Sequence, residues 1–285
     1  MKGIILAAGA GTRLYPASIP ISKILLPIYD KPMIYYPLST LMLAGIKDIL
    51  IITNEVDIDN FKKLFGNGQQ FGLNIEYKIQ YVQKGIADAF LIAEDWINND
   101  EVALILGDNI FHGHGFSTLM KNALKNNKGA TIFGYTVKDP ERFGVVEFDN
   151  NKKVLSIEEK PKHPKSNYAV TGLYFYDKNV CQYAKKIIPS QRGELEITDL
   201  NRIYLEQRNL NVEILGRGFA WLDTGTHDSM LQASNFVQSM ELNKGVKIAC
   251  VEEIAINQNF ISKENCLKFI SKFQNNDYYK YIERL

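Results

Sequence analysis

The sequence is poor in cysteine and has almost no net charge. Three cysteines, Cys181, Cys250 and Cys266, are scattered over 285 residues without a CxxC spacing, and their number is odd. A disulfide framework is therefore not expected, and a reducing compartment is the simpler interpretation. The formal net charge of +1 gives no reason to expect a nucleic-acid or membrane-surface partner. An anionic substrate must then be held by local groups of cations.

Long hydrophobic runs are also missing. No segment approaches the roughly 18 apolar residues that a membrane-spanning helix needs. The apolar start, residues 1–10, is short and broken by glycine, and Thr12 and Arg13 follow at once, so it does not predict an export signal. We therefore expect a cytoplasmic protein.

Apolar runs alternate with helical patterns in the first half of the chain. The expected strands are 3–8, 48–53, 73–80 and 102–106, and the expected helices are 33–44, 87–97 and 116–125. This alternation predicts a parallel sheet with helices on both faces.

The pattern changes after Gly129. Strand-like runs at 130–137, 144–148, 154–158 and 168–176 predict a mixed sheet that continues the first one, and helices 178–188 and 196–207 and a strand 211–215 follow. From His227 onward the chain looks helical. We expect one α/β domain, 1–226, with a small helical region, 227–285, packed on it.

A glycine-rich segment, residues 6–14 (LAAGAGTRL), follows the first expected strand directly. Glycines there allow a tight turn whose N–H groups approach phosphate oxygens. A plain strand-to-helix turn would look similar, and neither the dinucleotide fingerprint nor a Walker A loop matches. The nearby cations Arg13 and Lys23 favour a phosphate site, because ligands bind at the carboxyl ends of strands in open α/β sheets.

Two aspartates each end an apolar run. Asp108 follows VALILG and Asp223 lies in WLDTG. If both runs are strands of the core sheet, their carboxyl groups should converge within about 8 Å at its edge, as a magnesium site requires. Two carboxylates that close repel one another, so the site should favour a divalent cation or a raised pKa in one aspartate. The alternative interpretation is a helix cap for Asp108 and a turn former for Asp223.

Several motifs together carry a resemblance to a known family. After the glycine-rich turn come ISKILLP (21–27), DKPMIYYPL (30–38), LGDN (106–109), DPERFGVV (139–146), EEKP (158–161), GELEITD (193–199) and WLDTGT (221–226). In this order they resemble the sugar-phosphate nucleotidyltransferases, and within them the thymidylyltransferases, from about residue 2 to residue 285.

The resemblance implies a Rossmann-like fold with a nucleotide-binding half, about 1–128, and a sugar-binding half, about 129–226. It implies attack of a glucose 1-phosphate oxygen on the α-phosphorus of dTTP, with Mg²⁺ as cofactor. The products are dTDP-glucose and pyrophosphate, for dTDP-sugar (dTDP-rhamnose) and surface-polysaccharide synthesis. A phosphate monoester loses its second proton near pH ~6, so no general base is required. A homotetramer and a second nucleotide-sugar site for feedback are further implications.

The resemblance also implies roles for particular residues. The catalytic cations would be Arg13 at the leaving pyrophosphate, Lys23, and Lys160 at the sugar phosphate. The nucleotide would contact Leu6, Ala8, Gly9, Gly11, Thr12, Arg13, Gln80, Gly85 and Asp108, with Gln80 and Gly85 at the base. The sugar would contact Asn109, Gly144, Glu159, Lys160, Val170 and Thr171, and the metal would contact Asp108 and Asp223.

Three residues depart from the thymidylyltransferase pattern. Ile86 stands where leucine is common, Asp88 where glutamine is usual, and Phe143 where tyrosine is frequent. A related enzyme that uses UTP or another sugar 1-phosphate therefore stays open. A non-catalytic nucleotide-binding regulatory protein is the alternative of another class. Loss of Arg13, Lys160 or either aspartate would favour it, and all four are present.

Overall fold

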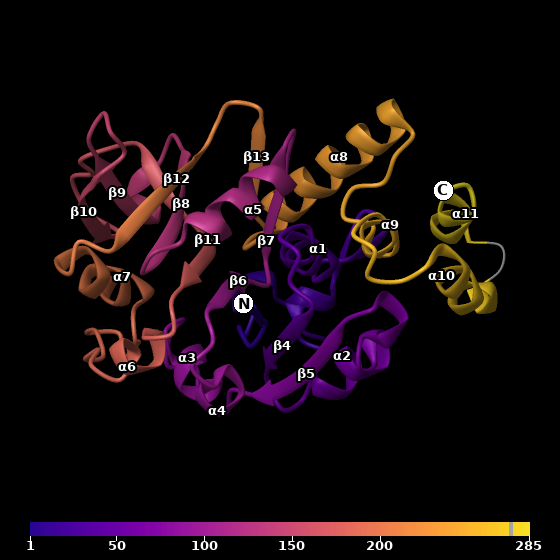
Figure 1. The fold of residues 1–285 in the computed structure, drawn as a ribbon, viewed down its shortest axis with the longest axis horizontal. Helices are drawn as coiled ribbons and strands as arrows, with labels where there is room; N and C mark the ends of the chain where they lie inside the picture. Colours follow the sequence, from indigo (N-terminus) through magenta and orange to yellow (C-terminus); the bar gives the residue numbers. More distant parts are fainter. Residues whose placement is uncertain (274–275) are drawn as a thin grey trace.

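The computed structural model describes residues 1–273 and 276–285, and in this part of the chain nine strands form one mixed sheet (Figure 1). The strand order is β10-β9-β11-β6-β1-β4-β5, with β8 between β11 and β12. The strands are β1 Lys2–Leu6, β4 Asp48–Thr53, β5 Asn74–Ile79, β6 Val102–Leu106, β8 Ala130–Thr136, β9 Gly144–Phe148, β10 Val154–Glu159, β11 Tyr168–Tyr176 and β12 Leu210–Leu215.

Parallel pairing brings several strand ends to one edge of the sheet. Leu6, the last residue of β1, lies opposite Ile52 of β4 and Leu106 of β6. β11 is antiparallel to both β6 and β8. The expected parallel sheet and its mixed continuation are both confirmed, and polar residues that follow β1 and β6 meet at the same edge.

Side chains alternate between the two faces of the sheet, and helices cover both. Ile4 faces the core that contains α3 Asp88–Ile92, α4 Glu94–Ile97, α6 Val180–Ala184 and α7 Ile197–Glu206. Ile5 faces the core that contains α1 Tyr35–Leu43, α2 Ile58–Phe65, α5 Phe116–Asn126, α8 His227–Lys244 and α9 Val251–Asn257. The continuous apolar run of β1 follows from burial on both faces.

Some elements differ from the sequence prediction. The helix expected at 87–97 is divided at Ala93 into α3 and α4, and the helix expected at 178–188 is confined to α6. A small hairpin, β2 Pro27–Ile28 and β3 Lys31–Pro32, was not expected. Neither was a separate antiparallel pair, β7 Asn109–Gly113 with β13 Phe219–Asp223.

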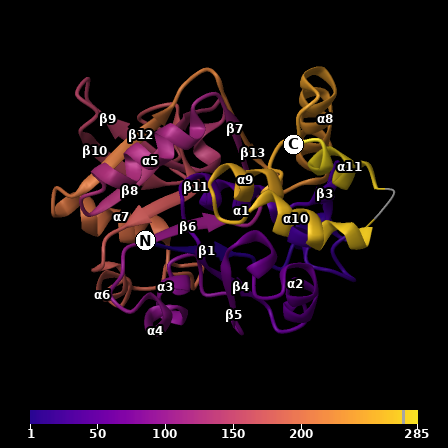
Figure 2. The ribbon, with the colours of Figure 1, turned by 45° about the vertical axis from the view of Figure 1, so that its right-hand side comes forward.

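The C-terminal helices extend to one edge of the molecule. Figures 1 and 2 show α10 Lys263–Ile270 and α11 Asp277–Glu283 beyond α9, away from the sheet. They enclose a small core of their own, made of Cys250, Cys266, Ile270, Tyr278 and Ile282. Within the described ranges, no helix has both the length and the apolar character that crossing a membrane demands.

Candidate active site

A cavity of about 450 Å³ lies at the carboxyl ends of β1 and β6. It brings together residues from the turn after β1, from β9 to β11, and from the loop before α7. The residues predicted for the site that line it are Leu6, Gly9, Arg13, Gln80, Gly85, Asp108, Asn109, Gly144, Glu159, Lys160, Val170 and Asp223.

The glycine-rich turn presents unpaired N–H groups. Gly11 has a left-handed backbone, φ 63°, and a Cβ there would lie 3.1 Å from Cβ of Lys23. The Ser18 hydroxyl donates to the Gly11 carbonyl over 2.7 Å and fixes the turn. In the described part of the chain, the N–H groups of Gly9, Ala10 and Gly11 donate to no backbone carbonyl. Clustered amides of this kind, with Arg13 following, suit an anion.

Lys23 lies behind the cavity wall. It begins the short turn Lys23–Leu25, and its ammonium group forms an ion pair with Asp108. The two side chains are only 12% and 15% exposed. Lys23 is absent from the cavity lining itself. The direct effect of Lys23 in this geometry is to hold the Asp108 carboxylate in place.

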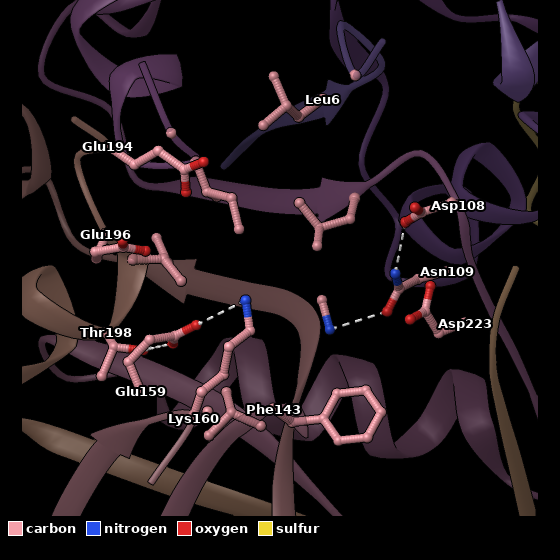
Figure 3. A pocket seen from close by; sticks show the side chains of 18 of the residues that line it. Leu6, Asp108, Asn109, Phe143, Glu159, Lys160, Glu194, Glu196, Thr198 and Asp223 are labelled. Atoms are coloured by element: carbon pink, nitrogen blue, oxygen red, sulfur yellow. Dashed lines mark hydrogen bonds and ion pairs between the residues drawn. The ribbon is translucent and has the colours of Figure 1, made fainter. Parts of the chain in front are cut away.

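Asn109 holds Asp108 from the other side. Its Nδ2 donates to Asp108 Oδ1 over 2.9 Å (Figure 3). Its Oδ1 accepts from Gly172 N at 3.0 Å and from Trp221 Nε1 at 2.7 Å. Both lone pairs of that oxygen are therefore used. The carboxamide predicted to contact the sugar serves here to orient the aspartate.

Asp108 and Asp223 converge, but the prediction that both end strands of the central sheet was wrong. Asp223 ends β13, which pairs with β7 and lies outside the central sheet, opposite Asn109 in register. Because the two strands are antiparallel, the first residue of β7 lies beside the last residue of β13. Thr224 fixes the junction, since its hydroxyl donates to the Asp108 carbonyl over 2.8 Å. Figure 3 shows Asp108, Asn109 and Asp223 together at one end of the cavity.

The environments of the two aspartates push their pKa values in opposite directions. Burial raises the pKa of Asp223, and the neighbouring Asp108 carboxylate raises it further. Burial is the largest single effect on Asp108 too, but the Lys23 ammonium and the hydrogen bonds from Asn109 and the backbone together lower the pKa of Asp108 below its ordinary value. The cations Lys23, Arg13 and Arg142 offset only part of this rise at Asp223, so the repulsion between the two carboxylates acts mainly on that residue.

Two carboxylates brought together in this way fit a divalent cation. No cluster of three or more His, Cys, Asp or Glu side chains suited to a metal occurs in residues 1–273 and 276–285. A metal bound by Asp108 and Asp223 would thus need further oxygen ligands from phosphate or water. Mg²⁺ is commonly bound in that way, by one or two carboxylates and substrate phosphates.

The other end of the cavity carries carboxylates around a lysine. Glu159 accepts from the Thr198 hydroxyl over 2.6 Å, and the Lys160 ammonium lies 3.6 Å from Glu159 (Figure 3). Lys160 has a left-handed backbone, φ 42°, although it is not glycine and precedes Pro161. Its N–H donates to the Phe143 carbonyl over 3.0 Å. Such a conformation is unfavourable and is typical of residues whose position serves a function.

Some predicted residues do not line the cavity, and others were missed. Thr171 is fully buried, because strand alternation gives the cavity face of β11 to Val170 and Gly172. Besides Thr171 and Lys23, the predicted residues outside the lining are Ala8, Gly11 and Thr12. Polar lining residues not predicted are Gln83, Arg142, Arg192, Glu194, Glu196 and Thr198. Most lie in the motifs DPERFGVV and GELEITD, which carried the resemblance, so the signal was present.

The fold and the site define an α/β protein whose cavity joins an anion-binding turn to paired carboxylates, and comparison with known proteins gives the family. The nucleotidyl transferase family matches residues 2–240, and the chain belongs to it. A glucose-1-phosphate thymidylyltransferase of Neisseria meningitidis is 56% identical over 285 residues, which covers 100% of this chain and 99% of the relative.

Solved structures agree with this family. A Bacillus anthracis protein described as a glucose-1-phosphate thymidylyltransferase, solved with sucrose, is 41% identical with a TM-score of 0.78, covering 89% of this chain and 99% of that one. A UDP-glucose pyrophosphorylase solved with UDP-glucose has a TM-score of 0.74 at 24% identity, covering 84% and 98%. The second similarity is one of fold alone.

Proposed function

We propose that the chain condenses dTTP with glucose 1-phosphate to give dTDP-glucose and pyrophosphate. The observation that carries this proposal is the single cavity that joins unpaired turn amides, a two-aspartate site and a lysine-containing carboxylate pocket. The Neisseria relative, which matches the whole chain, is named for this activity. The substrates of the class are a nucleoside triphosphate and a sugar phosphate, and the family typically uses a divalent metal.

The proposed roles follow from charge. The attacking sugar phosphate is mostly ionised near neutral pH, so the chain needs cations and positioning more than a base. Arg13 and the turn amides would stabilise the leaving pyrophosphate, and Lys160 would hold the sugar phosphate. Asp108 and Asp223 would bind Mg²⁺, which when bound neutralises charge on the phosphates of both substrates. Lys23 would keep Asp108 in place.

The choice of substrates is the first expected result. In a pyrophosphate-release assay over a panel of triphosphates and sugar 1-phosphates, dTTP with glucose 1-phosphate should give the highest kcat/KM. UTP should be usable but poorer, because a pocket discriminates by only about 1–3 kcal/mol per methyl-sized contact. If another sugar 1-phosphate exceeds glucose 1-phosphate tenfold, the specific pair is wrong and only the reaction class survives.

Removal of the Lys160 charge should affect the sugar phosphate most. Lys160→Ala should lower kcat/KM by roughly 10²-fold, with the largest change in the KM for glucose 1-phosphate, because that anion loses its main counter-charge. The matched control is Lys162→Ala, which removes an exposed lysine two residues away and outside the cavity. An unchanged glucose 1-phosphate KM in folded Lys160→Ala would remove this lysine from the sugar site.

Further parts of the proposal rest on the family resemblance. We propose a homotetramer, a second nucleotide-sugar site for feedback, and service in dTDP-rhamnose and surface-polysaccharide synthesis. The division into halves at about residue 128 and a helical region from 227 is likewise proposed. The unpaired state of Cys181, Cys250 and Cys266 supports a cytoplasmic location.

A further inference from the structure

Gln80 and Asp88 form a buried polar pair at the cavity wall. Gln80 follows β5 and Asp88 begins α3, and the two residues are 6% and 8% exposed. The Gln80 Nε2 donates to Asp88 Oδ2 over 2.9 Å. Gln80 lines the cavity, whereas Asp88 does not. Asp88 therefore acts on the cavity through its hydrogen bond with Gln80.

The chemistry of the pair fixes the orientation of the Gln80 amide. An unrestrained carboxamide can present either its oxygen or its nitrogen after a half-turn, whereas an ionised carboxylate accepts hydrogen bonds and donates none. Asp88 thus selects the orientation with Nε2 toward itself. Gln80 Oε1 is then the atom left for a ligand, and no donor within the described ranges reaches it.

Gly85 supplies a fixed donor to the same cavity. Its φ is +97°, and a Cβ there would lie 2.6 Å from the Leu195 carbonyl oxygen. The loop is held on both sides, by Leu195 N donating to the Lys84 carbonyl and by Ala87 N donating to the Leu195 carbonyl. The Gly85 N–H itself has no backbone acceptor in the part of the chain that the structure describes.

We propose that Asp88 is a positioning residue that sets base specificity by orienting Gln80. The wall then presents one fixed acceptor and one fixed donor, and it suits a base edge with a ring N–H beside a carbonyl oxygen. This inference rests on the proposed function, since the nucleobase must lie against Gln80. A glutamine at this position, usual in thymidylyltransferases, can donate or accept, whereas an ionised aspartate can only accept.

The pattern discriminates among bases in a definite way. Thymine and uracil offer N3–H beside a carbonyl, and guanine offers N1–H beside O6. Cytosine and adenine instead offer a bare ring nitrogen beside an amino group. With the ring nitrogen opposite Gln80 Oε1, the pair therefore disfavours cytosine and adenine, whose ring nitrogen has no hydrogen to donate. It does not separate dTTP from UTP, for which another contact is needed.

The test is base selectivity in Asp88→Asn. The new amide can donate to Gln80 Oε1, so Gln80 can turn and offer Nε2 to cytosine N3. The ratio of kcat/KM for dTTP to that for dCTP should fall at least about tenfold. The wild-type site rejects dCTP because its buried polar groups are left unpaired with that base, and the variant removes this penalty. The ratio of dTTP to UTP and the KM for glucose 1-phosphate should not change.

Two further variants make the result decisive. Gln80→Ala should also lower the ratio of kcat/KM for dTTP to that for dCTP. Asp95→Asn, a surface control with a 79% exposed side chain, should leave this ratio unchanged. Each ratio is measured on one preparation, so any misfolded fraction cancels.

If the dTTP-to-dCTP ratio is unchanged in Asp88→Asn but lowered in Gln80→Ala, the role of Asp88 is overturned and the base site stays in place. Unchanged ratios in both would remove the base from Gln80 and overturn the inference with it. A wild-type chain that turns over neither dTTP nor UTP with glucose 1-phosphate would instead defeat the proposed function.

Discussion

Replacing either Asp108 or Asp223 with asparagine should lower turnover by about 10²–10³-fold. Both carboxylates meet at one end of the cavity, although they come from strands 115 residues apart. Asparagine keeps the shape and removes one negative charge, so the affinity for a divalent cation should fall. High Mg²⁺, or Mn²⁺, should restore part of the activity of each variant.

The two aspartate variants should differ in stability. Asp108→Asn leaves the nearly buried Lys23 without its ion-pair partner, and this should lower the melting temperature. Asp223→Asn relieves repulsion from Asp108, and it should leave the melting temperature unchanged or raise it. Loss of activity with gain of stability marks a functional residue. The control is Asp59→Asn, whose side chain is 92% exposed.

Asp223→Asn also carries the test if Asp108→Asn does not fold. Near-normal turnover in folded Asp223→Asn would end the metal-site proposal. Asp223 would then be a turn former at the end of β13.

Arg13→Ala should lower kcat by about 10²–10³-fold, because it removes a preorganised charge aimed at a phosphoryl transition state. The Arg13 guanidinium lies over Gly225, where a Cβ would be 3.1 Å from Nη2 and 3.4 Å from Asp223 Oδ1. Its charge also lowers the pKa of Asp223, against burial and Asp108. The variant therefore loses both the positive charge at the phosphates and the lowering of the pKa of Asp223.

The matched control for Arg13→Ala is Arg202→Ala. Arg202 pairs with Asp199 on the surface of α7, and its side chain is 46% exposed. Exposed ion pairs contribute little, so this variant should keep its turnover and melting temperature. Equal turnover of Arg13→Ala and Arg202→Ala in steady-state assays would remove Arg13 from the site.

Local sequence signals predicted most of the fold and many of the residues that line the cavity. Buried strands such as β1 and β6 are continuous apolar runs, and the polar residues just after them must emerge at the carboxyl edge. This logic places Arg13 and Asp108 in one cavity without any knowledge of contacts. The convergence of the two carboxylates also explains why the pKa of one of them, Asp223, is raised.

What the sequence did not predict depends on pairing across long distances. The partner of β13 is β7, about 110 residues earlier, and no local pattern distinguishes this from membership in the central sheet. Thr171 lies outside the cavity lining because of strand alternation, since a shift of one residue moves a side chain to the other face. The contact between Gln80 and Asp88 depends on the loop that joins β5 to α3, where the chain has no periodic signal.

The most direct test of the central claim follows the oxygen atoms of the sugar phosphate. Glucose 1-phosphate carrying ¹⁸O in its phosphate group is incubated with dTTP, Mg²⁺ and the chain, and the products are analysed by mass spectrometry. Attack of a sugar-phosphate oxygen on the α-phosphorus predicts that all the label appears in dTDP-glucose and none in pyrophosphate. Labelled pyrophosphate, or no dTDP-glucose from a folded preparation, would contradict the account.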